Sequence, residues 1–220
     1  MALSARQKTL FPLLPAVFLG LIAPAVVHSV PASSQPQQVR NSQPPAGWKT
    51  YRQPGVPFEF SYPEDFLLDA HVNAKLGFIF AFMKKPGTPW LIDIDFSSRA
   101  NGSTDPHSPM PMEEFAIKTA RLACAADGPD STIECPGFTG KKVFRNRNGL
   151  DVVEFYLKQV SQRYNPPKTT KNLVGPVEAV LLPTLGSGQV LTFKRTDRDD
   201  TGLVNEKLLR EIADSVKLAR

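Results

Sequence analysis

Two aspartates on one expected strand are the side chains best placed to do chemistry in this sequence. Asp93 and Asp95 alternate with Ile and Phe, and a period of two is typical of a strand, so both carboxylates project from the same face. Paired carboxylates could share a hard cation such as Ca²⁺, which binds through oxygen ligands. The alternative is a solvated strand, or ion pairs between the aspartates and a basic segment formed by Lys141, Lys142 and Arg145.

A pair of cysteines, Cys124 and Cys135, supplies all the sulfhydryl chemistry of the chain. A redox site would be expected to have C-x-x-C spacing and a neighbour that stabilises the thiolate, whereas ten residues lie between these two. Cysteines of exported proteins are paired by default. Because the N-terminal residues have the features of an export signal, we expect one disulfide between Cys124 and Cys135.

A basic segment with one tyrosine and two prolines covers residues 163–171, RYNPPKTTK. We expect it to be a loop that joins two strands. Loops often carry binding residues, so Arg163, Tyr164, Lys168 and Lys171 are candidates for contact with an acidic partner. The alternative is a solvated connection without a binding role.

Other catalytic arrangements are absent from the sequence pattern. Neither His71 nor His107 has a cysteine or a second histidine at metal-ligand spacing. No Gly-rich phosphate loop and no nucleophile elbow precede a helix. Without residues 1–32, the chain has 24 Lys and Arg against 21 Asp and Glu. A nucleic-acid binder would normally have a concentrated basic face, so this weak excess does not favour one, and no cofactor is indicated.

Periodicity predicts an α+β domain with two helices. Apolar alternation predicts strands at 57–62, 78–82, 90–97, 141–147, 150–162, 177–182 and 189–195, and the first three form a meander. Asn148-Gly149 is a strong hairpin signal. Helical spacing predicts helices at 108–125 and 205–218. We therefore expect a mainly antiparallel sheet of about six or seven strands packed with two helices, one on each face, as an α/β/α sandwich.

Each expected helix has a core stripe at helical spacing. In the first helix the stripe contains Met112, Phe115, Ala116, Thr119, Leu122 and Ala123. In the second it contains Leu208, Leu209, Ile212 and Val216. Glu206 and Arg210 are one turn apart in the second helix, so we expect an exposed supporting ion pair between them.

The N-terminal residues 1–32 have the features of a secretory signal peptide. Arg6 and Lys8 precede an uncharged apolar run over 10–27, and small residues follow it. A retained membrane anchor is the alternative, because the run is at the lower limit of a bilayer-spanning length. Residues 33–47 are rich in Pro, Gln and Ser and predict a disordered tether. Residues 48–220 then form a single domain.

Two segments resemble the PsbP-like family: the aromatic alternation of residues 58–66, FEFSYPEDF, and the closing helix over 206–218. The resemblance extends over about residues 48–218. It implies an antiparallel sheet between helices and no catalysis, and it carries over no functional residue. The signal resembles a bacterial secretory one, so the chloroplast setting of some family members is not supported.

Together these patterns predict a secreted or periplasmic, non-catalytic binding or assembly module. Its partner would be a protein or a small ligand, not nucleic acid. One alternative is an extracytoplasmic hydrolase with an unrecognised site, for example a carboxylate pair as in glycosidases. Another is an accessory domain held at a membrane by an uncleaved signal.

Cleavage of the signal is directly testable. We expect the exported protein to begin at Ser33, after cleavage behind Ala32, with cleavage behind Ser29 as the second choice. N-terminal sequencing of the exported chain measures this. A chain that still begins at Met1 or Ala2 would contradict the prediction.

Overall fold

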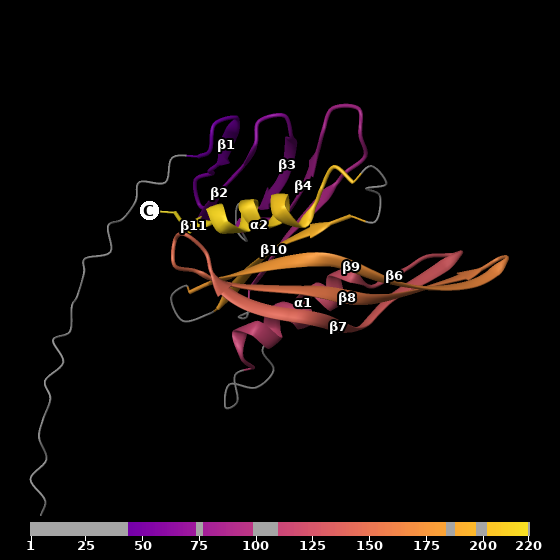
Figure 1. Ribbon diagram of the computed structural model, residues 1–220. Helices are drawn as coiled ribbons and strands as arrows, with labels where there is room; N and C mark the ends of the chain where they lie inside the picture. Colours follow the sequence, from indigo (N-terminus) through magenta and orange to yellow (C-terminus); the bar gives the residue numbers. More distant parts are fainter. Residues whose placement is uncertain (1–43, 74–76, 99–109, 184–187, 197–201, 220) are drawn as a thin grey trace, which may run out of the picture. The chain divides into compact units, whose positions relative to one another are not determined.

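An eight-stranded antiparallel sheet is the centre of the computed structural model, which describes residues 44–73, 77–98, 110–183, 188–196 and 202–219 (Figure 1). Its strand order is β3-β4-β5-β10-β9-β8-β7-β6. The strands are β3 Leu67–Asn73, β4 Gly77–Lys84, β5 Ile92–Ser98, β6 Ala126–Asp127, β7 Ser131–Arg145, β8 Asp151–Tyr164, β9 Pro167–Leu182 and β10 Gln189–Arg195.

A second, three-stranded sheet joins the two ends of the described chain. Its order is β1-β2-β11, and its strands are β1 Trp48–Tyr51, β2 Phe58–Pro63 and β11 Lys217–Leu218. β2 pairs with both neighbours in antiparallel register. The segment that follows the last helix is thereby fixed to the first strands of the domain.

The two helices cover opposite faces of the large sheet, as the sequence predicts. α1, Met112–Cys124, packs on β7 to β10, and α2, Glu206–Ser215, packs on β9, β10 and β2 (Figure 1). α2 begins at an Asn205 cap, whose side chain accepts a hydrogen bond from the backbone N–H of Leu208. Each helix therefore has a sheet face against which its apolar side is buried.

Two separate apolar cores result from this arrangement. On the α2 side, Phe58 and Phe60 of β2 pack with Phe193 of β10 and Ile212 of α2. The rings of Phe60 and Phe193 meet edge to face with centroids 5.4 Å apart. On the α1 side, a second cluster contains Phe115, Ala116, Val153, Phe155 and Val177. Burial of each large side chain contributes about 1.5–3 kcal/mol.

The sheet content is higher than the sequence predicts. The described residues form eleven strands in two sheets instead of about six or seven in one. The sequence did not predict four strands, β1, β3, β6 and β11, because they are short or mix polar with apolar residues. They are strands because they pair with neighbouring strands, which their own periodicity does not reveal. The predicted meander is also wrong in its first member, because β2 belongs to the small sheet and β3-β4-β5 is the meander.

The buried face of α1 differs from the predicted stripe. Phe115 and Ala116 are buried as expected, but Leu122 is 66% exposed and Ala123 is exposed. Ile117, Ala120 and Cys124 complete the buried face instead. The bond from Cys124 to β7 explains the difference, because it turns this side of the last helical turn toward the sheet.

The predicted Asn148-Gly149 hairpin is confirmed, with a wider turn than two residues. β7 ends at Arg145, β8 begins at Asp151, and Gly149 has a φ of 81°. The buried amide of Asn146 donates hydrogen bonds to the carbonyl oxygens of Ala213 and Val216. This turn therefore holds the C-terminal end of α2 as well as reversing the chain.

The predicted signal peptide, residues 1–32, and most of the predicted tether lie outside the described residues. In the part of the chain that the structure describes, no helix has the length and apolar character needed to cross a bilayer.

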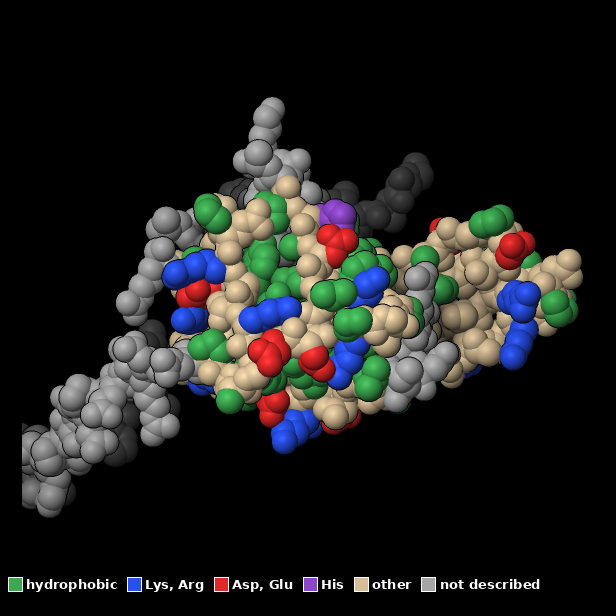
Figure 2. All heavy atoms as spheres, turned by 90° about the horizontal axis from the view of Figure 1, so that it is seen from above, with side chains coloured by type: hydrophobic (Ala, Val, Ile, Leu, Met, Phe, Trp, Pro, Cys, Tyr) green, Lys and Arg blue, Asp and Glu red, His purple; other side chains and the backbone are tan. Residues whose placement is uncertain are grey.

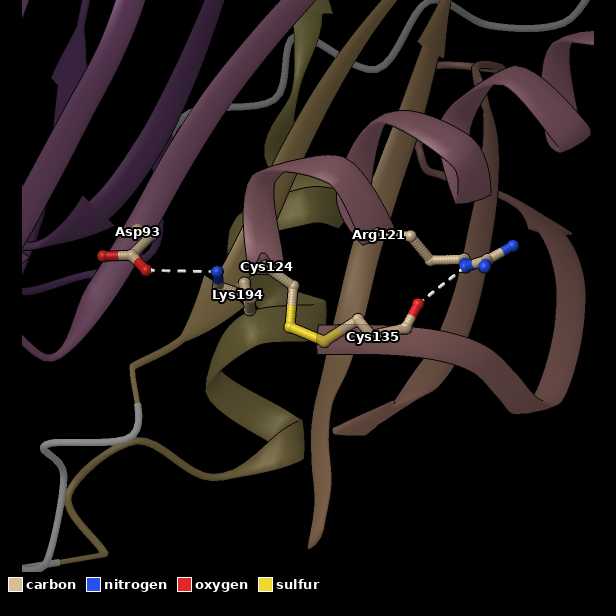
Figure 3. Close-up of a disulfide and its surroundings, with 5 residues drawn as sticks. All are labelled: Asp93, Arg121, Cys124, Cys135 and Lys194. Carbon is tan, nitrogen blue, oxygen red and sulfur yellow. Dashed lines mark hydrogen bonds and ion pairs between the residues drawn. A yellow bond between two sulfur atoms is a disulfide. The ribbon is translucent and has the colours of Figure 1, made fainter. Parts of the chain in front are cut away.

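The disulfide joins the end of α1 to β7 (Figure 3). Cys124 and Cys135 are bonded, with their α-carbons 6.0 Å apart, and the Nε–H of Arg121 donates to the carbonyl oxygen of Cys135 at 2.8 Å. One covalent bond and one hydrogen bond thus hold the last turn of α1 on the strand.

Loss of this disulfide should destabilise the domain. For the double variant Cys124→Ala and Cys135→Ala we expect the free energy of unfolding to fall by about 3 kcal/mol, since a short closed loop restricts the unfolded chain. Denaturant unfolding measures this, with the exposed Leu122→Ala as a control. Alkylation of two thiols in the unreduced exported protein would show that the bond does not form.

Candidate functional site

The two aspartates that were predicted to bind a cation lie on β5, the strand of the meander that pairs with β10. Asp93 and Asp95 face the same side, next to Phe82 and Phe80 of β4. The Nζ of Lys194 on β10 lies 3.4 Å from a carboxylate oxygen of Asp93 (Figure 3). Burial raises the pKa of Asp95, Lys194 lowers it, and Asp93 raises it further. Lys194 thus partly offsets the two neighbouring negative charges.

The expected ion pairs between these aspartates and the basic segment at 141–145 are wrong. Lys141 pairs with Glu113, Lys142 with Glu154 and Arg145 with Asp151. The physical reason is strand order, since β10, β9 and β8 lie between β5 and β7.

The described residues contain no group of three or more His, Cys, Asp or Glu side chains arranged to hold a metal ion. His71 of β3 stacks on Phe80, with ring centroids 4.4 Å apart, and His107 lies outside the described residues. Ca²⁺ binding by Asp93 and Asp95 stays a prediction.

The basic segment at 163–171 is a strand hairpin and not a loop. β8 continues to Tyr164 and β9 begins at Pro167, so only Asn165 and Pro166 lie between the strands. Together with β7 they form an arm, which we define as residues 131–140 and 157–175, and its outer end extends past both helices (Figure 1). From the α2 side, the arm projects laterally from the rest of the domain (Figure 2).

The register of β8 and β9 divides the four candidate side chains between the two faces of the arm. Arg163 lies opposite Lys168, so these two share one face. Tyr164 lies opposite Pro167 and Lys171 opposite Val160, which places both on the other face. The Tyr164 hydroxyl also contacts the Thr132 hydroxyl of β7. The structure therefore brings Arg163 and Lys168 together and separates them from Tyr164 and Lys171.

A cluster of buried charged residues between α2 and the sheet was missed by the sequence reasoning. Glu154 of β8 and Glu178 of β9 are directly opposite each other in the register, with side chains 2% and 0% exposed. The sequence did contain an indication of this cluster. Each glutamate interrupts an apolar strand, with the sequence VVEF around Glu154 and PVEAV around Glu178. Charged residues are rarely fully buried without a partner.

Arg210 of α2 and Lys142 of β7 compensate Glu154. The Nζ of Lys142 lies 2.9 Å from one carboxylate oxygen of Glu154, and the Arg210 guanidinium contacts the other. The guanidinium also lies over the ring of Phe144, 5.4 Å from its centroid. The expected Glu206–Arg210 pair is wrong, because Arg210 turns toward the sheet and Glu206 accepts a hydrogen bond from the hydroxyl of Tyr156.

Glu178 is poorly compensated. The Arg210 Nε lies 3.8 Å from one of its oxygens, which is an ion-pair distance, but neither oxygen has a hydrogen-bond partner among the described residues. Burial raises the pKa of Glu178 to about 8, an effect opposed by Lys142 and reinforced by Glu206. The hydrogen bond to Glu206, together with burial, raises the pKa of Tyr156 to about 12. Near pH 7 the Glu178 carboxyl is therefore mainly neutral.

Two adjacent carboxyl groups are a recurring arrangement in acid–base catalysis, but here they are not open to a substrate. An open groove of about 610 Å³ lies beside the cluster and is lined by Phe144, Glu206, Lys207, Arg210, Glu211 and Asp214. Neither Glu154 nor Glu178 lines it. The arrangement thus fits a structural clamp between α2 and the sheet better than a catalytic pair.

A second open groove, of about 480 Å³, lies where α1 meets the disulfide. It is lined by Lys118, Arg121, Leu122, Ala125, Glu134, Cys135 and Pro136. Leu122, the exposed apolar residue of α1 that does not contribute to the core, lines this groove.

The stability of the protein should depend on pH through Glu178. The folded state retains the Glu178 proton up to about pH 8, whereas the carboxyl of the unfolded chain titrates near 4.5. The folded state then binds more protons between these values, so the free energy of unfolding falls as pH rises through this window, on the order of 3–5 kcal/mol.

In Glu178→Gln we expect this slope to disappear and the variant to be more stable than the parent at pH 8. Urea unfolding at several pH values measures both effects, with Glu134→Gln, an exposed glutamate of β7, as the control. Equal slopes in the parent and in Glu178→Gln would contradict the prediction.

No family model matches the chain, and no curated protein sequence does. Among solved structures, the chain is similar to the solution structure of cyanobacterial PsbP (CyanoP) from Synechocystis sp. PCC 6803, with 15% identity, a TM-score of 0.45, and coverage of 79% of this chain and 94% of that one. It is also similar to a crystal structure from Bacteroides thetaiotaomicron VPI-5482, with 13% identity, a TM-score of 0.31, and coverage of 78% and 48%. At these TM-scores neither likeness bears on function, and membership of the PsbP-like family stays a prediction.

Proposed function

We propose that this chain is an exported, non-catalytic binding module that holds an acidic protein partner through the arm. The observation that carries this proposal is a set of four basic side chains on the hairpin of β8 and β9, here called the basic hairpin, residues 157–175. These are Lys158, Arg163, Lys168 and Lys171, and all four are exposed. No acidic residue occurs in this hairpin.

The charge of the basic hairpin is unbalanced within the domain. Among the described residues, none of its four cations makes an ion pair. Elsewhere many cations are paired, as Arg147 is with Asp214 at 2.7 Å and Lys217 is with Glu59 at 3.1 Å. Acidic residues close to the hairpin in the structure, Asp127, Asp130 and Glu134, belong to β6, β7 and the turn between them. Positive charge therefore collects on the hairpin of β8 and β9, which favours encounter with an acidic surface.

The outer end of the arm also has no packing role that would explain its length. Residues 162–169 are exposed throughout, including the aromatic Tyr164. A sheet that extends beyond its core loses conformational entropy without burying apolar area. Binding of a partner is the function that such an extension supports best.

A disulfide supports the extracytoplasmic setting of the proposal, because such bonds persist in oxidising compartments. The hydrolase alternative receives less support. Its strongest feature is the carboxyl pair of Glu154 and Glu178, which is covered by α2 and lines neither groove described above.

Charge reversal tests the role of the arm. In a variant with Arg163→Glu, Lys168→Glu and Lys171→Glu, we expect crosslinking to extracytoplasmic proteins to fall at least about tenfold, since attraction to an acidic partner becomes repulsion. The measurement places a photo-reactive residue at Thr169 of the exported protein and identifies the crosslinked proteins.

The control carries three matched reversals at exposed positions away from the arm, Lys118→Glu, Arg145→Glu and Lys207→Glu, with the same reactive residue. Equal crosslinking by the arm variant and the control would contradict the proposal. So would an enzymatic turnover that one substitution abolishes while the domain remains folded.

A further inference from the structure

The outer edge of β9 in the arm is an open strand edge. β10 pairs with β9 only from Val177 to Leu182, and β8 pairs with it on the other side as far as Pro167. Over Lys168–Gly175, no described strand therefore lies on the side of β9 away from β8. The backbone N–H and C=O groups on that side can accept another strand.

Other edges in the same sheet are protected, whereas this one is regular. The outer edge of β7 is interrupted by register shifts between Glu134 and Gly137 and between Thr139 and Lys142, and β6 covers Thr132 and Ile133. The edge strand β3 has a shift between His71 and Val72. In contrast, β9 pairs with β8 without a shift from Val174 to Pro167. Bulges are a common means of preventing edge pairing, and this edge has none.

The sequence of the open edge is also suited to strand pairing. Residues 168–175, KTTKNLVG, contain no proline, and half of them are threonine, leucine or valine, which are common in strands. Leu173 is 60% exposed, so it offers apolar contact that the domain itself does not use.

We infer that the edge of β9 over Lys168–Gly175 binds an extended acidic segment of another protein as an added β-strand. This inference rests on the proposed function, for which it names the mode of contact. Main-chain hydrogen bonds would hold the segment, and cross-strand charges would select it.

Charge complementarity decides the class of partner. Lys168 and Lys171 project from opposite faces of β9, because their positions differ by three and side chains alternate between faces. Arg163 lies opposite Lys168 on one face, and Lys158 lies opposite Leu173 on the other. An added strand would find positive charge on both of its faces, and opposite charges at cross-strand positions are stabilising. A second copy of β9 would instead bring like charges together.

Edge lysines also have a purely protective explanation, since natural proteins use them to prevent strand pairing. The two explanations differ in their consequences. If the lysines only protect the edge, their neutralisation should cause self-association and the parent should not bind an acidic strand. If the edge is a docking site, the parent binds an acidic strand and does so through its backbone.

The experiment uses the exported protein with ¹⁵N-labelled amides and a capped octapeptide of alternating glutamate and threonine. We expect amide shifts concentrated at residues 168–175. Lys168→Glu with Lys171→Glu should weaken binding about tenfold, whereas the matched Lys118→Glu with Lys207→Glu should leave it unchanged. An alternating lysine–threonine peptide should not bind.

Backbone methylation separates strand addition from simple charge attraction. In a paired strand, alternate N–H groups face the neighbour, so methylation of one alternate set should abolish binding and methylation of the other should leave it intact. Equal binding by the two methylated peptides, whether retained or lost, overturns the inference. Self-association of Lys168→Gln with Lys171→Gln, without peptide binding by the parent, overturns it as well.

Failure of the inference and failure of the proposed function give different results. If the methylated peptides bind equally but charge reversal of the arm still removes crosslinking, the arm acts as a charged surface without strand addition. If charge reversal leaves crosslinking unchanged, the proposed function itself is wrong.

Discussion

The antiparallel pairing of β8 with β9 is the constraint on which the rest of the structure depends. Because side chains alternate between faces, this single register fixes the environment of every residue on both strands. It places Val152 opposite Val180 in the core with α2, and Phe155 opposite Val177 in the core with α1. The same register makes Glu154 and Glu178 neighbours. A shift of β8 by one residue would exchange the faces of its side chains and move the Glu154 carboxyl to the α1 side.

The buried carboxyl groups explain how α2 is held in one position. A helix that packs on a sheet through aliphatic side chains alone can slide or rotate at small cost. Arg210 removes that freedom, because it must reach Glu154 while its guanidinium lies over Phe144. Asn146 adds a second fixed point at the C-terminal end of α2. Burial of Glu178 as a neutral acid is the cost of this arrangement, and it makes the clamp sensitive to alkaline pH.

The register shift between β8 and β9 near Gly175 divides this hairpin into two halves. One half stabilises the domain, and the other half is the one that we propose binds a partner. Toward β10 both faces are covered by helices, and the strands are apolar. Beyond the shift β9 pairs with β8 alone, and most of the residues are polar or basic. Changes at the exposed end of the arm, residues 162–169, can therefore alter recognition without a large effect on either core, which is the division expected where a rigid scaffold presents a binding element.

The sequence by itself determined the local properties: two helices, the reversal at Asn148-Gly149, the strands with strict alternation, and a cysteine pair suited to a disulfide. It did not determine which strands are neighbours. That information decided the partner of Asp93, the buried face of α1, and the meeting of Glu154 with Glu178, residues 24 positions apart. Periodicity reports how one segment divides its side chains between two faces, whereas contacts between segments depend on strand order and register. Only the tertiary structure therefore showed that residues 163–171 are the end of a strand pair with an open edge.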